Sequence, residues 1–367
     1  MNRKINVCLF VFFIFFYFSA CSRHHLKNAD AGNRLVIASP HPLALINPII
    51  ENFENESGID VLVFKSGTGE IISNVLRYPD TAPYDILWGG SYTSVLPFAK
   101  FFEKYKSCNE DAVHESYKNS EGMLTRFSDV PSVLMINRKR LGSIEVNGYA
   151  DLLNPLLKGQ IAFADPEFSS SSWEHLINML FAMGNGIPEN GWSYVEQLCL
   201  NLDGKIQQGS SAVYEGVAKG SFAVGLTFEE GAANYAQNDS NISIVYMKEG
   251  VVFTPDGIYL LKNARNPENA KRFIDYATAF PVQNYISRQL NRRSVRSDIA
   301  IKQLFLPKNL INCIEIDHKK ASACQNEWIS EFHNLLFSQE SPENSENSGN
   351  SETFHAKNAA AGGGVQK

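Results

Sequence analysis

In the first quarter of the chain, short apolar runs typical of strands alternate with segments whose apolar residues recur at helical spacing. Residues 34–38 (RLVIA) and 59–64 (IDVLVF) are short apolar runs that predict two strands. Between them, apolar side chains recur at helical spacing until Gly58, which predicts a helix ending at this glycine. The polar segment 66–70 (SGTGE) leads into a second helix, and residues 84–88 (YDILW) predict a third strand. The order strand, helix, strand, helix, strand indicates an α/β lobe with a parallel sheet.

The same alternation continues through the middle of the chain. Further strands are predicted over residues 132–136, 160–164 and 222–226, and a helix is predicted from about Trp173 to Met183. Polar turn sequences follow several of these strands. In open α/β sheets, ligands bind at the carboxyl ends of the strands, so these turns are candidate ligand-binding segments.

The N-terminal residues have the pattern of an export signal. Basic side chains precede an apolar run over residues 7–19, which is shorter than the roughly 20 residues of a permanent membrane span and suits a signal peptide over residues 1–20. The small residues Ser19 and Ala20 stand directly before Cys21, a spacing that resembles the lipobox of bacterial lipoproteins. We therefore expect Cys21 to be acylated and to anchor the exported protein to a membrane, facing the periplasm or the outside. An ordinary signal peptide with an unrelated cysteine is the alternative.

Two polar segments are expected to flank the folded part. Residues 21–33 predict a tether between the anchor and the folded domain. Residues 338–367 consist largely of Ser, Asn, Glu and Gly and bury too little apolar surface to offset chain entropy, so they predict a disordered tail. About 300 residues remain between these segments, which is enough for two lobes.

Composition excludes several classes of function. The net charge of -6 and the lack of a basic patch with interleaved aromatics argue against a nucleic-acid partner. No GxSxG, GK[ST] or HExxH motif is present, so we expect neither an enzyme nor a cofactor. Zinc-site spacing is absent among the six cysteines, and we expect no metal as a resident ligand. A bridge between Cys313 and Cys324 is permitted in an oxidising compartment, but the sequence does not decide it.

Six stretches of the chain carry a family resemblance, and they are residues 53–70, 84–90, 164–172, 216–235, 248–276 and 291–296. In this order they resemble type II periplasmic binding proteins, which serve ferric-ion, phosphonate and hexose-phosphate ABC importers. The resemblance implies two α/β lobes joined by a hinge of two crossing strands, with a small solute bound between them. It places lobe one over residues 34–135, lobe two over 136–248, and a return to lobe one with C-terminal helices over 249–337. It also implies a monomer that works with an ABC permease and ATPase.

The polar turns then become candidate ligand contacts. Glycines before a helix let the backbone approach a ligand, and the free N–H groups of a helix start favour an anion. A simple helix cap is the alternative reading of the same residues. The carboxylates after the strand at 222–226 could accept bonds from sugar hydroxyls, pair with an amine, or face solvent. The full candidate set is Ser39, His41, Ser66, Gly67, Thr68, Gly69, Gly90, Ser91, Ser170, Ser171, Ser172, Ser210, Ser211, Tyr214, Thr227, Glu229, Glu230 and Asp256.

The lack of an adjacent tyrosine pair decides which ligand we expect. Many ferric-binding members of the resembled family have two adjacent tyrosines after the strand equivalent to 222–226, whereas this chain has only Tyr235, several residues later. We therefore expect a small anionic solute, with a hexose phosphate as first choice and an aminoalkylphosphonate as second. Ferric iron is the alternative within the class. A surface adhesin or antigen without a transport role is the alternative from another class.

Overall fold

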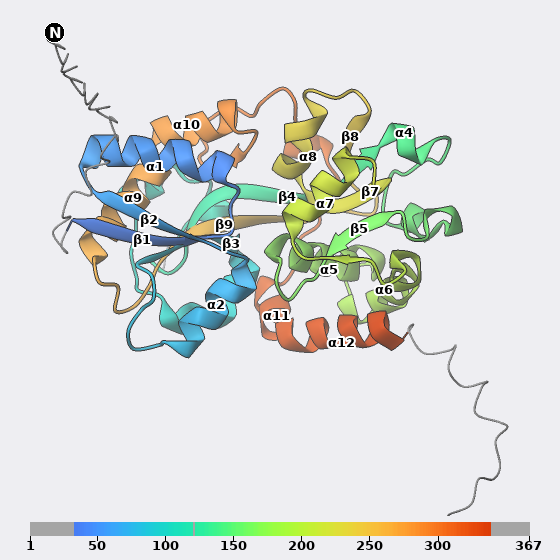
Figure 1. Cartoon of the computed structure of the whole chain (residues 1–367), viewed down its shortest axis with the longest axis horizontal. Helices are drawn as coiled ribbons and strands as arrows, with labels where there is room; N and C mark the ends of the chain where they lie inside the picture. Colours follow the sequence, from blue (N-terminus) through green and yellow to red (C-terminus); the bar gives the residue numbers. More distant parts are fainter. Residues whose placement is uncertain (1–32, 120–121, 339–367) are drawn as a thin grey trace, which may run out of the picture.

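The computed structural model describes residues 33–119 and 122–338 (Figure 1). The expected signal peptide, Cys21 and residues 339–367 lie outside the described residues. Within the described part, no helix combines the length and the apolar character that a membrane crossing requires. The described residues form the two-lobed α/β fold that the sequence predicts, with β4 and β9 running between the lobes.

The first lobe begins with the alternating elements that the sequence predicts. Strand β1 (Arg34–Ser39) pairs in parallel with β2 (Asp60–Lys65) and β3 (Ile86–Ser91). Helices α1 (Leu43–Ser57) and α2 (Thr68–Arg77) connect these strands. The apolar faces of the helices are buried against the sheet, so the ends of β1 and β3 and the start of α2 meet at one edge.

Two strands join the lobes and form the hinge. Strand β4 (Thr125–Asn137) pairs with β9 (Phe253–Leu260) over its first half and with strands of the second lobe over its second half. The change of partner falls between Pro131 and Ser132. The lobe boundary at residue 135 stays a prediction, although the strand pairing already changes at 131/132.

The second lobe is built around the second half of β4. Its sheet follows the order β4-β7-β5-β6, with β8 also paired to β4, and its core packs the helices onto this sheet. The elements are α4 (Arg138–Leu141), β5 (Ile161–Ala164), α5 (Ser170–Met183), α6 (Pro188–Leu202), β6 (Ile206–Gln207), α7 (Ser210–Ala218), β7 (Val224–Phe228), α8 (Glu229–Ala236) and β8 (Ile242–Val245).

The rest of the chain contributes to both lobes. Helices α9 (Pro267–Thr278) and α10 (Phe280–Gln289) pack in the core of lobe one, and β10 (Arg293–Ser294) pairs with the first half of β4. Helix α12 (Gln325–Phe337) instead packs on lobe two, where its aromatic side chains join that core. The short helices α3 (Tyr92–Val95) and α11 (His318–Ala323) lie beside each other between these regions.

The cysteine bridge that the sequence left open is not formed. Cys313 and Cys324 are both free thiols. The backbone of Cys313 is tied to Val251 by a parallel bridge, whereas Cys324 ends α11 with its N–H bonded to the Lys320 carbonyl. Each cysteine is therefore held by separate main-chain contacts.

Candidate functional site

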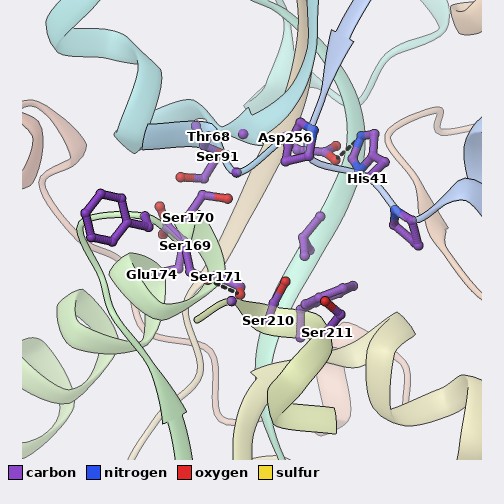
Figure 2. Close-up of a pocket in the computed structure, with 18 of the residues that line it drawn as sticks. His41, Thr68, Ser91, Ser169, Ser170, Ser171, Glu174, Ser210, Ser211 and Asp256 are labelled. Carbon is purple, nitrogen blue, oxygen red and sulfur yellow. Dashed lines mark hydrogen bonds and ion pairs between the residues drawn. The ribbon is translucent and has the colours of Figure 1, made fainter. Parts of the chain in front are cut away.

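A cavity of about 710 Å³ lies between the lobes (Figure 2). This volume is typical of sites for small organic ligands. Its wall combines the starts of three helices, α2 from lobe one and α5 and α7 from lobe two, with a floor near the hinge. Among the sequence-predicted residues, His41, Ser66, Gly67, Thr68, Gly90, Ser91, Ser170, Ser171, Ser210, Ser211, Tyr214 and Asp256 line it.

The start of α2 touches the opposite lobe. A Cβ on Gly67 would lie 2.8 Å from the Phe168 carbonyl oxygen, and one on Gly69 would lie 2.3 Å from the Glu167 carbonyl oxygen. Only glycine therefore allows the two loops to approach this closely. The Oγ1 of Thr68 is buried without a hydrogen-bond partner in the described structure, and it lies on the cavity wall. The turn at 66–69 thus shares one cavity with the serine-rich turn before α5.

The two helix starts of lobe two supply hydroxyls and main-chain amides. The Oγ of Ser169 caps α5 by accepting from the N–H of Ser172, 3.4 Å away, and Ser170 and Ser171 line the cavity. Helix α7 has no side-chain cap, because its N-cap residue is Gly209. The partial positive charges of α2, α5 and α7 therefore point toward the same space, an arrangement that favours an anion.

Arg292, which local sequence pattern does not single out, forms the floor of the cavity. Its guanidinium is buried, donates to Oδ2 of Asp256 over 2.7 Å and to Oγ of Ser128 over 3.1 Å, and also bonds Glu230. His41 lies beside this group. Burial, with Arg292 and Lys65 adding to it, lowers the pKa of His41 well below its usual value, which favours the neutral imidazole. Its Nε2 lies 3.2 Å from Oδ2 of Asp256 without the alignment of a hydrogen bond.

Glu229 and Glu230 do not line the cavity, contrary to the expectation that they meet the ligand. Glu229 forms a two-point pair with Arg293, with both oxygens 2.7 Å from guanidinium nitrogens. Glu230 pairs with Arg292. These pairs are buried and link α8 of lobe two to the segment after α10 of lobe one. The two carboxylates therefore join the lobes rather than face a solute.

Four other candidates lie behind the cavity wall. The Oγ of Ser39 donates to the Trp88 carbonyl over 2.6 Å. Thr227 is buried, and its carbonyl lies 2.7 Å from Nε2 of His175. Ser172 is buried within α5, and Gly69 faces the loop of the other lobe. These residues support the wall without being part of it.

Glu174 is a second wall residue that local sequence pattern does not single out. It lies on α5, is only 5 % exposed, and lines the cavity. Burial raises the pKa of its carboxyl to about 7, although the hydroxyls of Ser91, Thr254 and Thr93 oppose this shift. The sequence does not distinguish Glu174 from a solvent-facing glutamate. Helix α5 is buried on nearly all sides, so its polar residues do not mark a solvent-exposed face.

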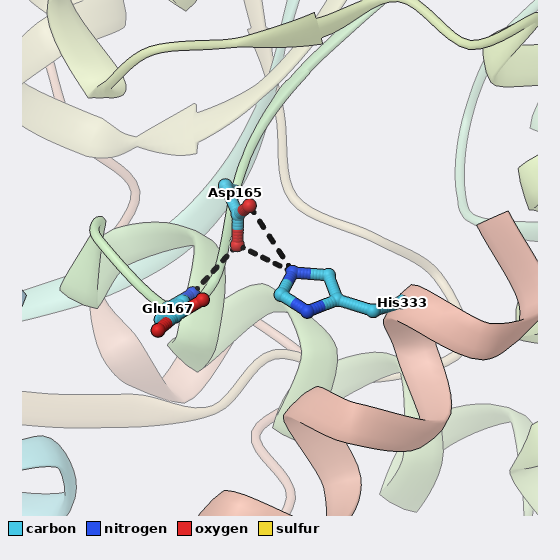
Figure 3. Close-up of side chains that lie close together, drawn as sticks. All are labelled: Asp165, Glu167 and His333. Carbon is cyan, nitrogen blue, oxygen red and sulfur yellow. Dashed lines mark hydrogen bonds and ion pairs between the residues drawn. The ribbon is translucent and has the colours of Figure 1, made fainter. Parts of the chain in front are cut away.

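Three side chains of types that can bind a metal, Asp165, Glu167 and His333, lie together outside the cavity (Figure 3). Nε2 of His333 on α12 lies 3.0 and 3.1 Å from the two carboxylate oxygens of Asp165, which follows β5. The N–H of Glu167 donates to the same carboxylate over 2.8 Å. The group ties α12 to the loop that leads into α5.

Of the described residues on the cavity wall, Tyr214 is the one tyrosine.

Comparison with known proteins identifies the class of this arrangement. The bacterial extracellular solute-binding protein family matches residues 98–309. An uncharacterized protein of Haemophilus influenzae is 23% identical over 325 residues, covering 83% of this chain and 92% of the relative. The Fe(3+)-binding periplasmic protein of Serratia marcescens is 23% identical and covers 68% of this chain and 75% of its own.

A solved structure shares the fold. The periplasmic binding protein AfuA from Actinobacillus pleuropneumoniae, solved with exogenous fructose-6-phosphate bound, has a TM-score of 0.76 at 20% identity. The match covers 83% of this chain and 98% of AfuA. With its two lobes, its hinge and the cavity between them, the chain belongs to the family of bacterial extracellular solute-binding proteins, the solute-capturing components of ABC importers.

Proposed function

We propose that the protein captures a small organic phosphate between its lobes and delivers it to an ABC permease, with a hexose phosphate as the first choice. The observation that carries this proposal is the convergence of three helix starts, with their serine and threonine hydroxyls, on one cavity. Such groups solvate an anion without a matching cation. No part of this role requires catalysis.

The described wall carries four carboxylates and two cations, so an anion there would be held mainly by neutral hydroxyl and main-chain N–H donors. Lys65 and Arg292 are the cations on the described wall, and Arg292 is already bonded to Asp256 and Glu230. A hydrogen bond to a charged group contributes roughly 1.5–3 kcal/mol. Four or five such bonds, less the cost of ordering, correspond to micromolar affinity, or about 8 kcal/mol. AfuA, with its bound fructose-6-phosphate, supports a sugar phosphate.

Ferric iron is the second candidate, because one relative is named an Fe(3+)-binding periplasmic protein. The arrangement of oxygen donors favours it less. Tyr214 offers one phenol on the described wall, and Arg292 holds the carboxylate of Asp256. Tyr235 lies off the described wall, with its ring centroid 6.0 Å from that of Tyr214. An aminoalkylphosphonate remains the second choice among the phosphorus compounds.

A thermal-shift screen of the purified protein tests the proposal. The screen contains hexose phosphates, aminoalkylphosphonates and Fe(III)-citrate. A ligand at a hundredfold its dissociation constant stabilises the protein by about 2.7 kcal/mol. We expect a response to phosphate esters that weakens when Ser210 and Ser211 are both changed to Ala. The control Ser193→Ala, on the exposed side of α6, should keep it. A response to Fe(III)-citrate alone would refute the organic phosphate.

We further propose that the protein is exported, anchored through lipid on Cys21, and monomeric. The support is the sequence before Cys21 and the extracellular character of the family. Expression with radiolabelled palmitate should label the wild type and leave Cys21→Ala unlabelled and soluble. Equal labelling of both proteins would contradict the anchor. An adhesin or antigen would show no ligand response in the thermal-shift screen.

A further inference from the structure

The cavity contains a buried carboxylate with no partner in the described structure. Both oxygens of Glu174 are shielded from solvent, and neither forms a hydrogen bond with a described residue. Burying an ionised carboxylate without a partner is strongly unfavourable. Glu174 nevertheless sits on the cavity wall, close to Ser170 and Ser171 of the same helix (Figure 2). The nearby hydroxyls of Ser91, Thr93 and Thr254 leave this carboxylate without an aligned donor, so a ligand in the cavity can supply one.

The other carboxylates of the described wall already have partners. Asp256 accepts from Arg292 over 2.7 Å, and Glu215 pairs with Lys219 over 3.0 Å. Glu70 accepts from the hydroxyl of Ser66. Glu174 differs from these three because it has no cation partner among the described residues, and the hydroxyls of Ser91, Thr93 and Thr254 near it do not form an aligned hydrogen bond with it.

The cations of the described wall do not serve Glu174. Nζ of Lys65 donates to the Pro40 carbonyl over 3.1 Å, and Arg292 is engaged by Asp256 and Glu230. The nearby lobe-one hydroxyl of Thr254 is itself buried without a partner. Burial raises the pKa of Glu174 to about 7, so a bound donor would favour its ionised form.

We propose that Glu174 is a donor subsite, which binds a hydroxyl or ammonium group of the ligand while the anionic group lies at the helix starts. The ligand would then be bifunctional, with a phosphate or phosphonate at one end and a hydrogen-bond donor at the other. This inference rests on the proposed function and narrows its ligand class. It also assigns to Glu174 the role that the sequence suggested for Glu229 and Glu230.

Two matched pairs of probes test the subsite by titration calorimetry. The first pair is 2-aminoethylphosphonate and ethylphosphonate, and the second is glucose 6-phosphate and cyclohexylmethyl phosphate. The second member of each pair keeps the anion and lacks the donors. In the wild type, we expect the donor-bearing member of at least one pair to bind roughly tenfold or more tightly. In Glu174→Gln, this preference should fall by roughly tenfold, while affinity for the donor-free member stays unchanged.

A charge-matched control separates the subsite from a general effect. Glu196→Gln, on the exposed surface of α6, should keep the wild-type preference. The inference alone fails if all four anions bind without a preference for donors, or if the preference survives in Glu174→Gln. Should none of the four bind, the proposed function fails and the subsite fails with it.

Discussion

The two buried Arg–Glu pairs at the hinge make a strong prediction about stability. Glu229 and Glu230 are adjacent on lobe two, and Arg293 and Arg292 are adjacent on the lobe-one side, so two consecutive pairs cross the hinge. Changing Glu229 to Ala would leave Arg293 without its carboxylate partner. The hydroxyl of Tyr246, which donates to Glu229, would lose its acceptor as well.

The size of the effect follows from burial. The side chains of Arg293 and Glu229 are only 6% and 3% exposed. Removing one partner of a buried pair costs about 3–5 kcal/mol, because a charge remains buried without compensation. The pair of Lys219 and Glu215 is 71% and 44% exposed, and an exposed pair within one helix contributes about 0.3–0.5 kcal/mol.

Urea unfolding followed by tryptophan fluorescence measures the difference. We expect Glu229→Ala to lose about 3–5 kcal/mol in the free energy of unfolding and Glu215→Ala to lose less than about 1 kcal/mol. A double variant with Met at both positions 229 and 293 should be more stable than Glu229→Ala, because it removes both charges together. A loss below about 1 kcal/mol in Glu229→Ala would show that Arg293 is solvated, and it would refute the reasoning.

Three further predictions concern closure and pH. Gly69→Ala should weaken binding of phosphate esters, because its Cβ would lie 2.3 Å from the Glu167 carbonyl oxygen and keep the lobes apart. The radius of gyration of the liganded protein in X-ray scattering should therefore increase, and an unchanged radius would contradict this. Glu174→Gln should stabilise the unliganded protein by about 3 kcal/mol above pH 7, because burial raises the pKa of Glu174 from its ordinary value of 4.5 to about 7 and its ionisation then opposes folding. The gain should vanish as pH falls toward 4.5, and equal gains in urea unfolding at pH 8 and pH 5 would exclude a buried charge as its cause. Burial lowers the pKa of His175 in the folded protein to about 4, so the free energy of unfolding should fall as the pH drops from 6.5 to 4. His175→Gln should make the free energy of unfolding less dependent on pH over this range. An unchanged pH dependence would assign the titration to another group.

Local pattern was enough to predict most of the fold. Strand β1 begins at the predicted residue, β2 within one residue of it, and α1 ends before Gly58, whose left-handed φ of 70° closes the helix. The pairing of β4 with both lobes could not be read from its own residues. It depends on β7 and β9, which follow about a hundred residues later.

The candidate site was predicted where it depends on turns and missed where it depends on tertiary pairing. The serine and glycine turns line the cavity because strand ends and helix starts place them there. Arg292 stands 62 residues after Glu230, and nothing local indicates that they meet. Glu174 was missed because α5 also buries His175 and Asn178. The polar residues of this helix therefore do not mark the side that meets the cavity.

A crystal structure with the tightest-binding phosphate ester of the screen tests the central claim most directly. The account predicts phosphate oxygens within hydrogen-bond distance of first-turn amides of α2, α5 and α7, with the turn at 66–69 touching the loop at 167–168. A phosphate outside the interlobe cavity, or one bound only by lysine and arginine side chains, would contradict it.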